Sequence, residues 1–340
     1  MPRKENLKSP IFICGCSRSG TTLLRTILGN HSNIYKIKGE TFLFTKNKKL
    51  IINALEKKLS NPNETKYLIM SILASLFEGG LNAIPYIEKD EFPAYIKRMS
   101  DELMTHEKVD FINDVYDAFD LCANYLAQKE NKNRWVEKTP TNIHFIPFTL
   151  SHYPDAKIIE IHRDPRAVYL SWKNAEHEYF KKSDFLEAIV TWRKSINAGL
   201  KYKNVLKDQY YQVQYKDLIL SPENEIKKLC EFLNEDFEPQ MLNVKVFNSF
   251  FEDTKDKTGF NKIAINRWEN LLSENEKILV DLLTKKYRDV LNYPDSNAKL
   301  TLSNLLPFLL FTTKTSIESR KEIGEILKSK ITLLIKGKGL

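Results

Sequence analysis

The sequence predicts an α/β fold, specifically a P-loop-like, doubly wound parallel sheet flanked by helices, with a helical insertion. Short apolar runs that suit buried strands alternate along the chain with segments of helical spacing. The first apolar run, Ile11 to Cys14, continues through a tight loop from Gly15 to Gly20 into an expected helix from Thr21 to Leu28. This layout favours phosphate binding, because backbone N–H groups at the start of a helix bind anions.

Further strands and helices are expected downstream in the same alternation. The strands are expected at Arg134 to Glu137, Ala156 to His162 and Tyr210 to Tyr215. Pro165 fits the first turn of a helix, and Pro222 fits another helix that has Ser221 at its N-cap. Ligands of doubly wound sheets bind at the carboxyl ends of the strands. We therefore expect the first loop, Lys138, Arg163 and Tyr215 to converge on one cleft.

The domain organisation follows from where this alternation stops. Residues 1–300 are expected to form one domain, with 43–130 as a helical insertion that shapes the acceptor side. Apolar residues recur at helical spacing from Leu68 to Phe77 and from Phe111 to Leu126. Residues 301–340 are expected to form a helical extension whose basic, amphipathic part packs on the body, pairs with a second subunit in a homodimer, or lies on a membrane.

Composition restricts the function without choosing it. The formal net charge is +8, which suits an anionic ligand, an acidic substrate or a membrane surface. The lysines are scattered rather than grouped, which argues against a nucleic-acid partner. The four cysteines form no C-x-x-C pair and have no histidine at zinc spacing, so neither a metal site nor a disulfide is expected. No apolar run is long enough for a signal peptide or a transmembrane segment, so a soluble, cytoplasmic protein is expected.

The glycine loop differs from a Walker A sequence at one informative position. Its spacing is that of G-x-x-x-x-G-K-[ST], but Thr21 stands where the lysine belongs. The positive charge lies instead at Arg18, whose planar guanidinium can bind two oxygens of a phosphate or sulfate. Ser19, Thr21 and Thr22 add hydroxyl donors. The alternative is a glycine turn that merely joins a strand to a helix.

Two motifs together resemble those of a known enzyme family. The sequence SRSGTT follows the first strand, and RDPRAVYLSW begins at Arg163. Alone, Arg163-Asp164 is typical of a surface ion pair whose aspartate caps a helix. In this order, on strand-to-helix turns, the two motifs resemble those of sulfotransferases that use 3′-phosphoadenosine 5′-phosphosulfate (PAPS). The segment from Tyr215 to Leu233 and the late segment Ile265 to Trp268 are also similar to that family.

The resemblance implies cofactor-binding roles for particular residues. The first motif would wrap the 5′-phosphosulfate, and Arg163 with Ser171, eight residues on, would bind the 3′-phosphate. Tyr215 would reach toward the adenosine. Lys262 or Arg267 would also meet the 3′-phosphate. The first-motif residues implied in this way are Arg18, Ser19, Gly20, Thr21 and Thr22.

The catalytic roles follow from a resemblance to the tyrosylprotein sulfotransferase branch. The segments concerned are Gly39-Glu40-Thr41 and Glu137-Lys138-Thr139-Pro140. Glu40 would act as the base that takes the acceptor's proton, with His144 as the second choice. Lys138 and Arg18 would offset negative charge at the leaving phosphate. The acceptor class stays open between a carbohydrate, a small metabolite, a lipid head group and a peptide tyrosine.

The leading prediction is therefore a sulfotransferase that transfers a sulfuryl group from PAPS to a hydroxyl by in-line displacement. One alternative is a P-loop kinase or NTPase, which the missing lysine and the absence of a clear Walker B carboxylate argue against. Another is a non-catalytic nucleotide-binding protein, which an intact cofactor site without turnover would indicate.

Overall fold

The computed structural model describes residues 8–37, 39–43, 111–175, 177–182, 185–245 and 258–299. Within them, five parallel strands form one sheet with the order β2-β3-β1-β4-β5. The strands are β1 (Ile11–Gly15), β2 (Ile34–Lys36), β3 (Arg134–Lys138), β4 (Lys157–His162) and β5 (Tyr210–Gln214). The parallel, doubly wound α/β fold expected from the sequence is confirmed.

The central strand β1 is where the strand order reverses. From β1 the chain passes first to β2 and β3 on one side, and later to β4 and β5 on the other. Ile13 of β1 lies in register with Lys138 of β3, and Gly15 lies in register with Ile161 of β4. In a doubly wound sheet the ligand crevice opens at the carboxyl end of the strand where the order reverses. The loop after β1 occupies that position.

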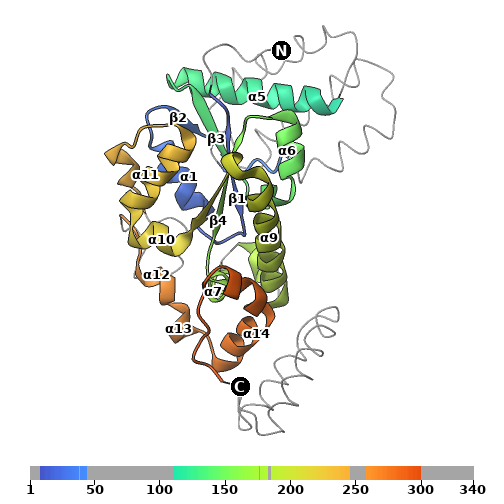
Figure 1. The fold of residues 1–340 in the computed structure, drawn as a ribbon, viewed down its shortest axis with the longest axis vertical. Coiled ribbons are helices and arrows are strands. Elements are labelled where there is room, and N and C mark those ends of the chain that lie inside the picture. The colour runs from blue at the N-terminus through green and yellow to red at the C-terminus, as the bar shows by residue number, and fades with distance from the viewer. Residues whose placement is uncertain are drawn as a thin grey trace.

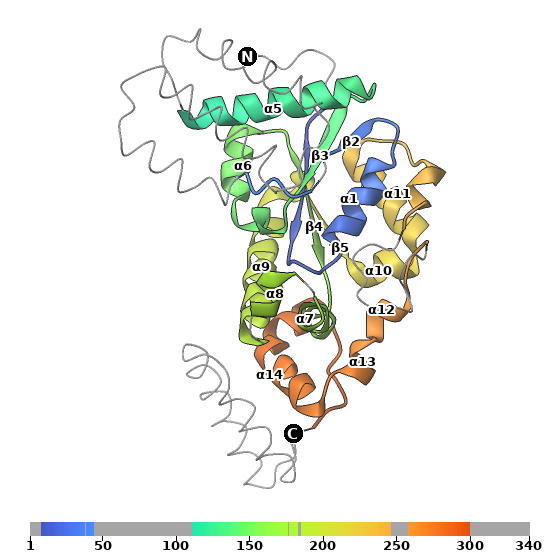
Figure 2. The same cartoon turned by 180° about the vertical axis from the view of Figure 1, so that it is seen from behind.

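Helices cover both faces of the sheet. One face carries α1 (Thr21–Gly29), α10 (Tyr215–Leu220) and α11 (Pro222–Leu233), and the other carries α6 (Ile146–His152) and α9 (Phe185–Leu206) (Figures 1 and 2). Successive side chains of a strand point to opposite faces, so a strand covered on both sides is apolar throughout. Ile11 and Ile13 accordingly pack in the core beneath α1 and α11, and the Phe12 ring meets Trp135 on the other face.

The remaining helices lie at the two ends of the sheet. The long helix α5 (Phe111–Lys129) crosses the end opposite α7 in Figure 1 and contacts β2 and β3. It confirms the helical spacing that was read from Phe111 to Leu126. The carboxyl end of the sheet carries α7 (Pro165–Lys173), α8 (Glu178–Lys182), α12 (Ile263–Asn266), α13 (Trp268–Leu271) and α14 (Glu274–Val290). Three short 3-10 helices complete the described elements, at Pro140–His144, Lys207–Gln209 and Pro239–Leu242.

Local capping chemistry sets the start of the helices. Asp164 caps α7 by accepting a hydrogen bond from the Arg166 backbone N–H at 2.9 Å, and Pro165 occupies the first turn as expected. Ser221 stands at the N-cap of α11, but its hydroxyl makes no capping hydrogen bond. Tyr215 begins α10 rather than ending β5, so the expected strand is one residue too long at this end.

Several expectations fall outside the described residues. The helix expected from Leu68 to Phe77, most of the 43–130 insertion and the 301–340 extension lie there, so the domain boundaries stay predictions. All four cysteines are described, and each is buried and outside any disulfide. Among the described helices, none combines the length and the apolar character that crossing a membrane requires.

Candidate active site

The loop after β1 has a backbone that only small residues at its two ends permit. Gly15 has φ 136° and Gly20 has φ 105°, in the region that side-chain-bearing residues avoid. A Cβ on Gly15 would lie 2.4 Å from the Ile161 carbonyl oxygen, and one on Gly20 would lie 2.7 Å from the Tyr215 ring. Gly20 precedes α1, which has neither a side-chain cap nor an acidic residue in its first turn. The positive end of α1 therefore suits an anion.

Arg18 lies within this loop and joins it to α7. Its Nε donates a hydrogen bond to Ser171 Oγ at 3.0 Å, across a sequence separation of 153 residues. Burial and the nearby charge of Arg163 together lower the pKa of Arg18 to about 10, and the charge of Glu40 opposes part of this shift. The guanidinium thus stays positive at neutral pH. The structure brings together the arginine of the first motif and the serine of the second.

Arg163, at the end of β4, also turns toward the loop. Its Nη1 donates to the Arg18 carbonyl oxygen at 3.3 Å, and its Nη2 donates to the Ala264 carbonyl oxygen at 2.6 Å. The guanidinium carbon lies 4.3 Å from the centroid of the Tyr215 ring. Arg163 Nε is buried and has no hydrogen-bond partner within the described residues. A buried donor without a partner marks a place where a ligand oxygen can bind.

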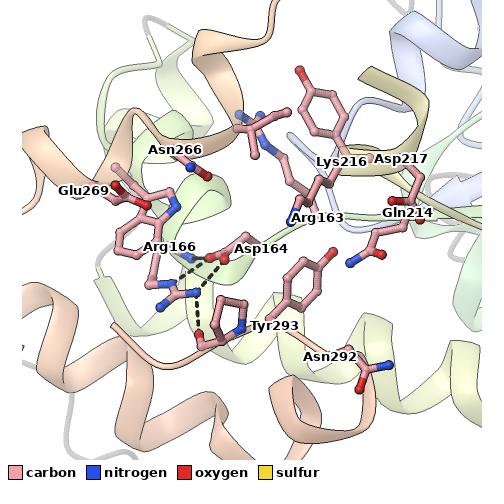
Figure 3. A pocket seen from close by; sticks show the side chains of 14 residues that line it. Arg163, Asp164, Arg166, Gln214, Lys216, Asp217, Asn266, Glu269, Asn292 and Tyr293 are labelled. Atoms are coloured by element: carbon pink, nitrogen blue, oxygen red, sulfur yellow. Dashed lines mark hydrogen bonds and ion pairs between the residues drawn. The ribbon is translucent and has the colours of Figure 1, made fainter. Parts of the chain in front are cut away.

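A cavity of about 200 Å³ lies on the other side of Arg163. Figure 3 shows Arg163, Asp164, Arg166 and Tyr293 around it. The Arg166 guanidinium forms ion pairs with Asp164 at 2.6 Å and with Asp281 at 3.3 Å. Asp164 therefore pairs with Arg166 and caps α7, and the sequence-level alternative of an Arg163–Asp164 ion pair is wrong. Among the residues that the structure describes, Arg163 has no carboxylate partner, so its charge is available to an anionic ligand.

Glu40 and Lys138 form an ion pair next to the loop. Lys138 is the last residue of β3, which pairs with β1, so its position beside the loop follows from the strand order. Its side chain is 3% exposed, against 32% for that of Glu40. Burial lowers the pKa of the Lys138 ammonium, and the Glu40 carboxylate opposes that shift. The structure thus brings together a carboxylate, an ammonium group and a guanidinium at one end of the sheet.

Comparison with known proteins gives the family of this chain. A model of the sulfotransferase family matches residues 10–239, which include both motifs and the Lys138 strand. The chain belongs to the sulfotransferase family. The sulfotransferase is 25% identical over 305 residues to a putative protein-tyrosine sulfotransferase of Caenorhabditis briggsae. This alignment covers 87% of this chain and 92% of that protein. It is 24% identical to protein-tyrosine sulfotransferase 1 of Danio rerio, over 68% of this chain and 57% of that protein.

Solved structures agree on the fold. The sulfotransferase domain from the olefin synthase of Synechococcus PCC 7002 aligns with a TM-score of 0.56 and 21% identity, covering 86% of this chain and 98% of that one. The sulfotransferase domain from the curacin biosynthetic pathway aligns with a TM-score of 0.57 and 20% identity, covering 86% of this chain and 100% of that one. This sulfotransferase therefore has the fold of both domains.

The structure also describes the other residues that the sequence singled out. His144 ends the first 3-10 helix of the sulfotransferase with a partly exposed side chain, and the partial loss of solvent around its ring, together with the Lys194 charge, lowers its pKa. Its ring has no described contact with Glu40, Lys138 or Arg18. Lys262 is exposed just before α12, and Arg267 lies between α12 and α13. Neither Lys262 nor Arg267 lines the cavity beside Arg163.

Two buried histidines have structural roles. His162 Nδ1 lies 2.9 Å from the Tyr293 hydroxyl, and burial lowers the pKa of the ring to about 3. His31 is buried just after α1, where its Nε2 lies 2.9 Å from the Asp236 carbonyl oxygen. Both imidazoles therefore hold segments of the fold together rather than face the site.

Two residues of the site were given no role by the sequence interpretation. Arg25 of α1 donates from Nη1 to the carbonyl oxygens of Ile37 and Gly39, which precede Glu40. Glu137 of β3 accepts hydrogen bonds from Thr41, which follows Glu40. A signal existed for Arg25, which is the single charged residue of the helix TTLLRTILG. A buried charge needs partners, and those partners are often functional.

A metal site is not evident in the described ranges. No group of three or more histidine, cysteine, aspartate or glutamate side chains gathers there in a way that suits a metal ion. The charge near the loop instead comes from Arg18, Arg163 and Lys138.

Proposed function

We propose that this sulfotransferase uses PAPS as its donor and transfers the sulfuryl group to a hydroxyl acceptor. The observation that carries the proposal is the joining of the two motifs through the Arg18–Ser171 hydrogen bond and the Arg163–Arg18 hydrogen bond. Two like-charged guanidinium groups held this close favour a ligand with more than one anionic group. PAPS fits this site, because Arg163 Nε is a buried donor that lacks a partner and α1 begins without a cap.

We assign the two ends of the nucleotide to different parts of the site. The 5′-phosphosulfate is placed on the loop, and the 3′-phosphate on Arg163 and Ser171. The Arg163–Tyr215 contact supports a place for the adenosine beside that ring. Lys262 or Arg267 is proposed to add a further charge at the 3′-phosphate. The loop residues in this assignment are Arg18, Ser19, Gly20, Thr21 and Thr22.

The catalytic proposal gives Glu40 and Lys138 complementary roles. When bound, PAPS supplies the sulfuryl group: the acceptor oxygen forms a new O–S bond, and the S–O bond to the 5′-phosphate breaks with its electron pair on the phosphate oxygen. Glu40 takes the proton of the acceptor hydroxyl as its oxygen becomes a nucleophile. Lys138 and Arg18 offset the negative charge that collects on the leaving phosphate. Their charges are already in place, so little reorganisation accompanies the reaction.

The acceptor proposal begins with a tyrosine hydroxyl, because two relatives are named as protein-tyrosine sulfotransferases. A carbohydrate, a small metabolite and a lipid head group are the other classes. We also propose a reducing compartment, the cytoplasm, for the protein. The cysteine pattern supports it, since the sequence has no C-x-x-C pair and each of the four thiols is buried without a disulfide.

The first prediction tests the donor. The product nucleotide, 3′-phosphoadenosine 5′-phosphate (PAP), is expected to bind in calorimetry, and adenosine 5′-diphosphate more weakly because it lacks the 3′-phosphate. Arg163→Ala is expected to weaken PAP binding by about 30- to 100-fold while changing the diphosphate little, as loss of a charge-assisted hydrogen bond implies. Arg18→Ala is expected to weaken both nucleotides.

Lys227→Ala, an exposed lysine on α11, is the control for losing one positive charge. A wild-type protein that binds no PAP would sink the donor proposal, and magnesium-dependent ATP binding would favour a kinase or NTPase.

The second prediction tests the base. Glu40→Gln is expected to lower kcat by about 100- to 10,000-fold, because a positioned general base contributes that much, while PAP binding stays within twofold. The measurement is single-turnover transfer from sulfur-labelled PAPS to acceptors found in a screen of tyrosine peptides, sugars and phenols. Unimpaired transfer by Glu40→Gln, combined with its loss in His144→Ala, would assign the base role to His144.

A further inference from the structure

The segment that carries Glu40 has a backbone shape that needs external support. It leaves β2 with a hydrogen bond from the Ile37 N–H to the Val136 carbonyl oxygen at 3.0 Å. It then turns through Gly39, at φ 81°, and Phe42, at φ 51°. A left-handed conformation is costly for a phenylalanine, and it persists only where the surroundings impose it. Contacts on both sides of Glu40 therefore hold this turn.

Glu137 holds the side of the turn that follows Glu40. Its Oε1 accepts hydrogen bonds from the Thr41 N–H at 3.3 Å, the Thr41 hydroxyl at 2.9 Å and the Thr139 hydroxyl at 2.6 Å. Its Oε2 accepts one from the Asn142 amide at 2.6 Å. All four groups donate to the carboxylate. Burial raises the pKa of Glu137, and the hydrogen bonds from Thr139 and Thr41 oppose that rise. The Thr139 hydroxyl in turn accepts from the Phe42 N–H at 3.3 Å, which extends the network past Glu40.

Arg25 holds the side that precedes Glu40. Its Nη1 donates to the Ile37 carbonyl oxygen at 3.3 Å and to the Gly39 carbonyl oxygen. Arg25 lies on α1, the helix that begins directly at the glycine loop. Since a helix is stiff over one turn, this contact fixes the Glu40 segment relative to the loop that we assign to the phosphosulfate.

We propose that Arg25 and Glu137 are positioning residues that clamp the Glu40 segment from its two sides and so hold the carboxylate against Lys138. The inference rests on the proposed role of Glu40. Neither clamp residue takes part in the Glu40–Lys138 ion pair, and neighbouring side chains on a strand point to opposite faces, so Glu137 and Lys138 act on different sides of β3. The clamp links two elements of the proposed active site, because Arg25 lies on α1, which follows the glycine loop, and Glu137 lies on β3, which ends at Lys138.

The test uses Thr41, because changing it loosens the clamp without removing a buried charge. Thr41→Val keeps the side-chain shape and removes the hydroxyl that donates to Glu137, whereas Thr41→Ser keeps that donor. Thr41→Val is expected to lower kcat by about 10- to 100-fold, as a misplaced base implies, with the KM for PAPS and the Kd for PAP within twofold. Thr41→Ser is expected to stay within about threefold of wild type.

The matched control is Thr149→Val, a buried threonine of α6 whose hydroxyl binds the Phe145 carbonyl oxygen at 3.1 Å. A Thr41→Val enzyme with the kcat of Thr149→Val would overturn the clamp. Glu137→Gln adds a readout that needs no acceptor: hydrogen exchange at the Thr41 and Phe42 amides is expected to accelerate by about tenfold or more. Unchanged exchange at both amides in folded Glu137→Gln would also overturn it.

Failure of the clamp and failure of the base role give different results. Loss of transfer in Glu40→Gln without loss in Thr41→Val overturns the clamp alone. Transfer that survives in Glu40→Gln overturns the base role, and the clamp as stated here falls with it. Loss in both variants, with recovery in Thr41→Ser, supports the two together.

Discussion

Two fully buried glutamates face the same side of the sheet and meet different surroundings. Glu137 of β3 receives four hydrogen bonds, as described above. Glu160 of β4 receives two, from the Tyr210 hydroxyl and the Gln212 amide, both at 2.7 Å. Burial raises the pKa of Glu160 to about 7, and the two hydrogen bonds only partly oppose this. Glu160 is thus a group whose protonation changes near neutral pH although nothing links it to the reaction.

The third prediction concerns the pH dependence of stability through Glu160. Its pKa is raised from 4.5 to about 7 in the folded protein, so the folded state holds a proton that the unfolded state loses above pH 4.5. The contribution of Glu160 to the free energy of unfolding is therefore complete below pH 4.5, and it declines by about 3 kcal/mol as the pH rises to 7. Glu160→Gln cannot ionise at this position. The free energy of unfolding of the variant minus that of wild type is therefore expected to increase by about 2–3 kcal/mol as the pH rises from 4.5 to 8.

Urea unfolding at pH 4.5, 6 and 8 measures this difference. Glu225→Gln is the control, since Glu225 also accepts a hydrogen bond from a tyrosine of β5, Tyr211, at 3.0 Å. Parallel pH profiles for wild type and Glu160→Gln would contradict the prediction.

At the scale of elements, the sequence is most informative where one local cause decides the structure. The expected strand Ile11 to Cys14 and helix Thr21 to Leu28 agree with β1 and α1 to within one residue at each end. An apolar run buried on both faces and a glycine loop with required backbone angles leave few alternatives. By contrast, β2 has three residues at the sheet edge and no distinct pattern, and it was not predicted.

The site shows the same division between local and distant causes. The grouping of the first loop with Arg163 and Ser171 was predictable, because strand-to-helix turns of a parallel sheet open at one end. The partner of Asp164 was not, since Arg163 and Arg166 lie only one and two residues from it in sequence. The links to Thr41 were also beyond reach, because Glu137 lies 96 residues away along the chain and only the pairing of β2 with β3 brings the two segments together.

At the scale of the whole molecule, the strand order explains how distant segments form one active site. The elements that supply the site leave the sheet at β1, β2, β3, β4 and β5 in turn, and all leave from its carboxyl end. The cations Arg18, Lys138 and Arg163 gather there, so part of the net charge of +8 is concentrated where we place an anionic donor. A homodimer stays a prediction, as does the packing of the 301–340 extension.

The four buried cysteines have a consequence for following the motions of this enzyme. They lie on β1, in the glycine loop, on α5 and on α11, and burial raises the thiol pKa of Cys14, Cys16 and Cys230. A neutral, shielded thiol reacts with an aromatic disulfide reagent only when its surroundings open. The fourth prediction is that all four thiols react at least about 1,000-fold more slowly in the native protein than in denaturant, as measured by absorbance.

Fast native labelling of Cys16 in a single-cysteine variant would contradict the closed loop, and Cys230 of α11 provides the comparison. The rate of thiol labelling also reports on ligand binding. A ligand at 100 times its Kd slows opening-dependent labelling by about 100-fold wherever the opening disrupts its site. Labelling rates of Cys16 and Cys230, with and without PAP, would show whether the loop opens with the whole sheet or on its own.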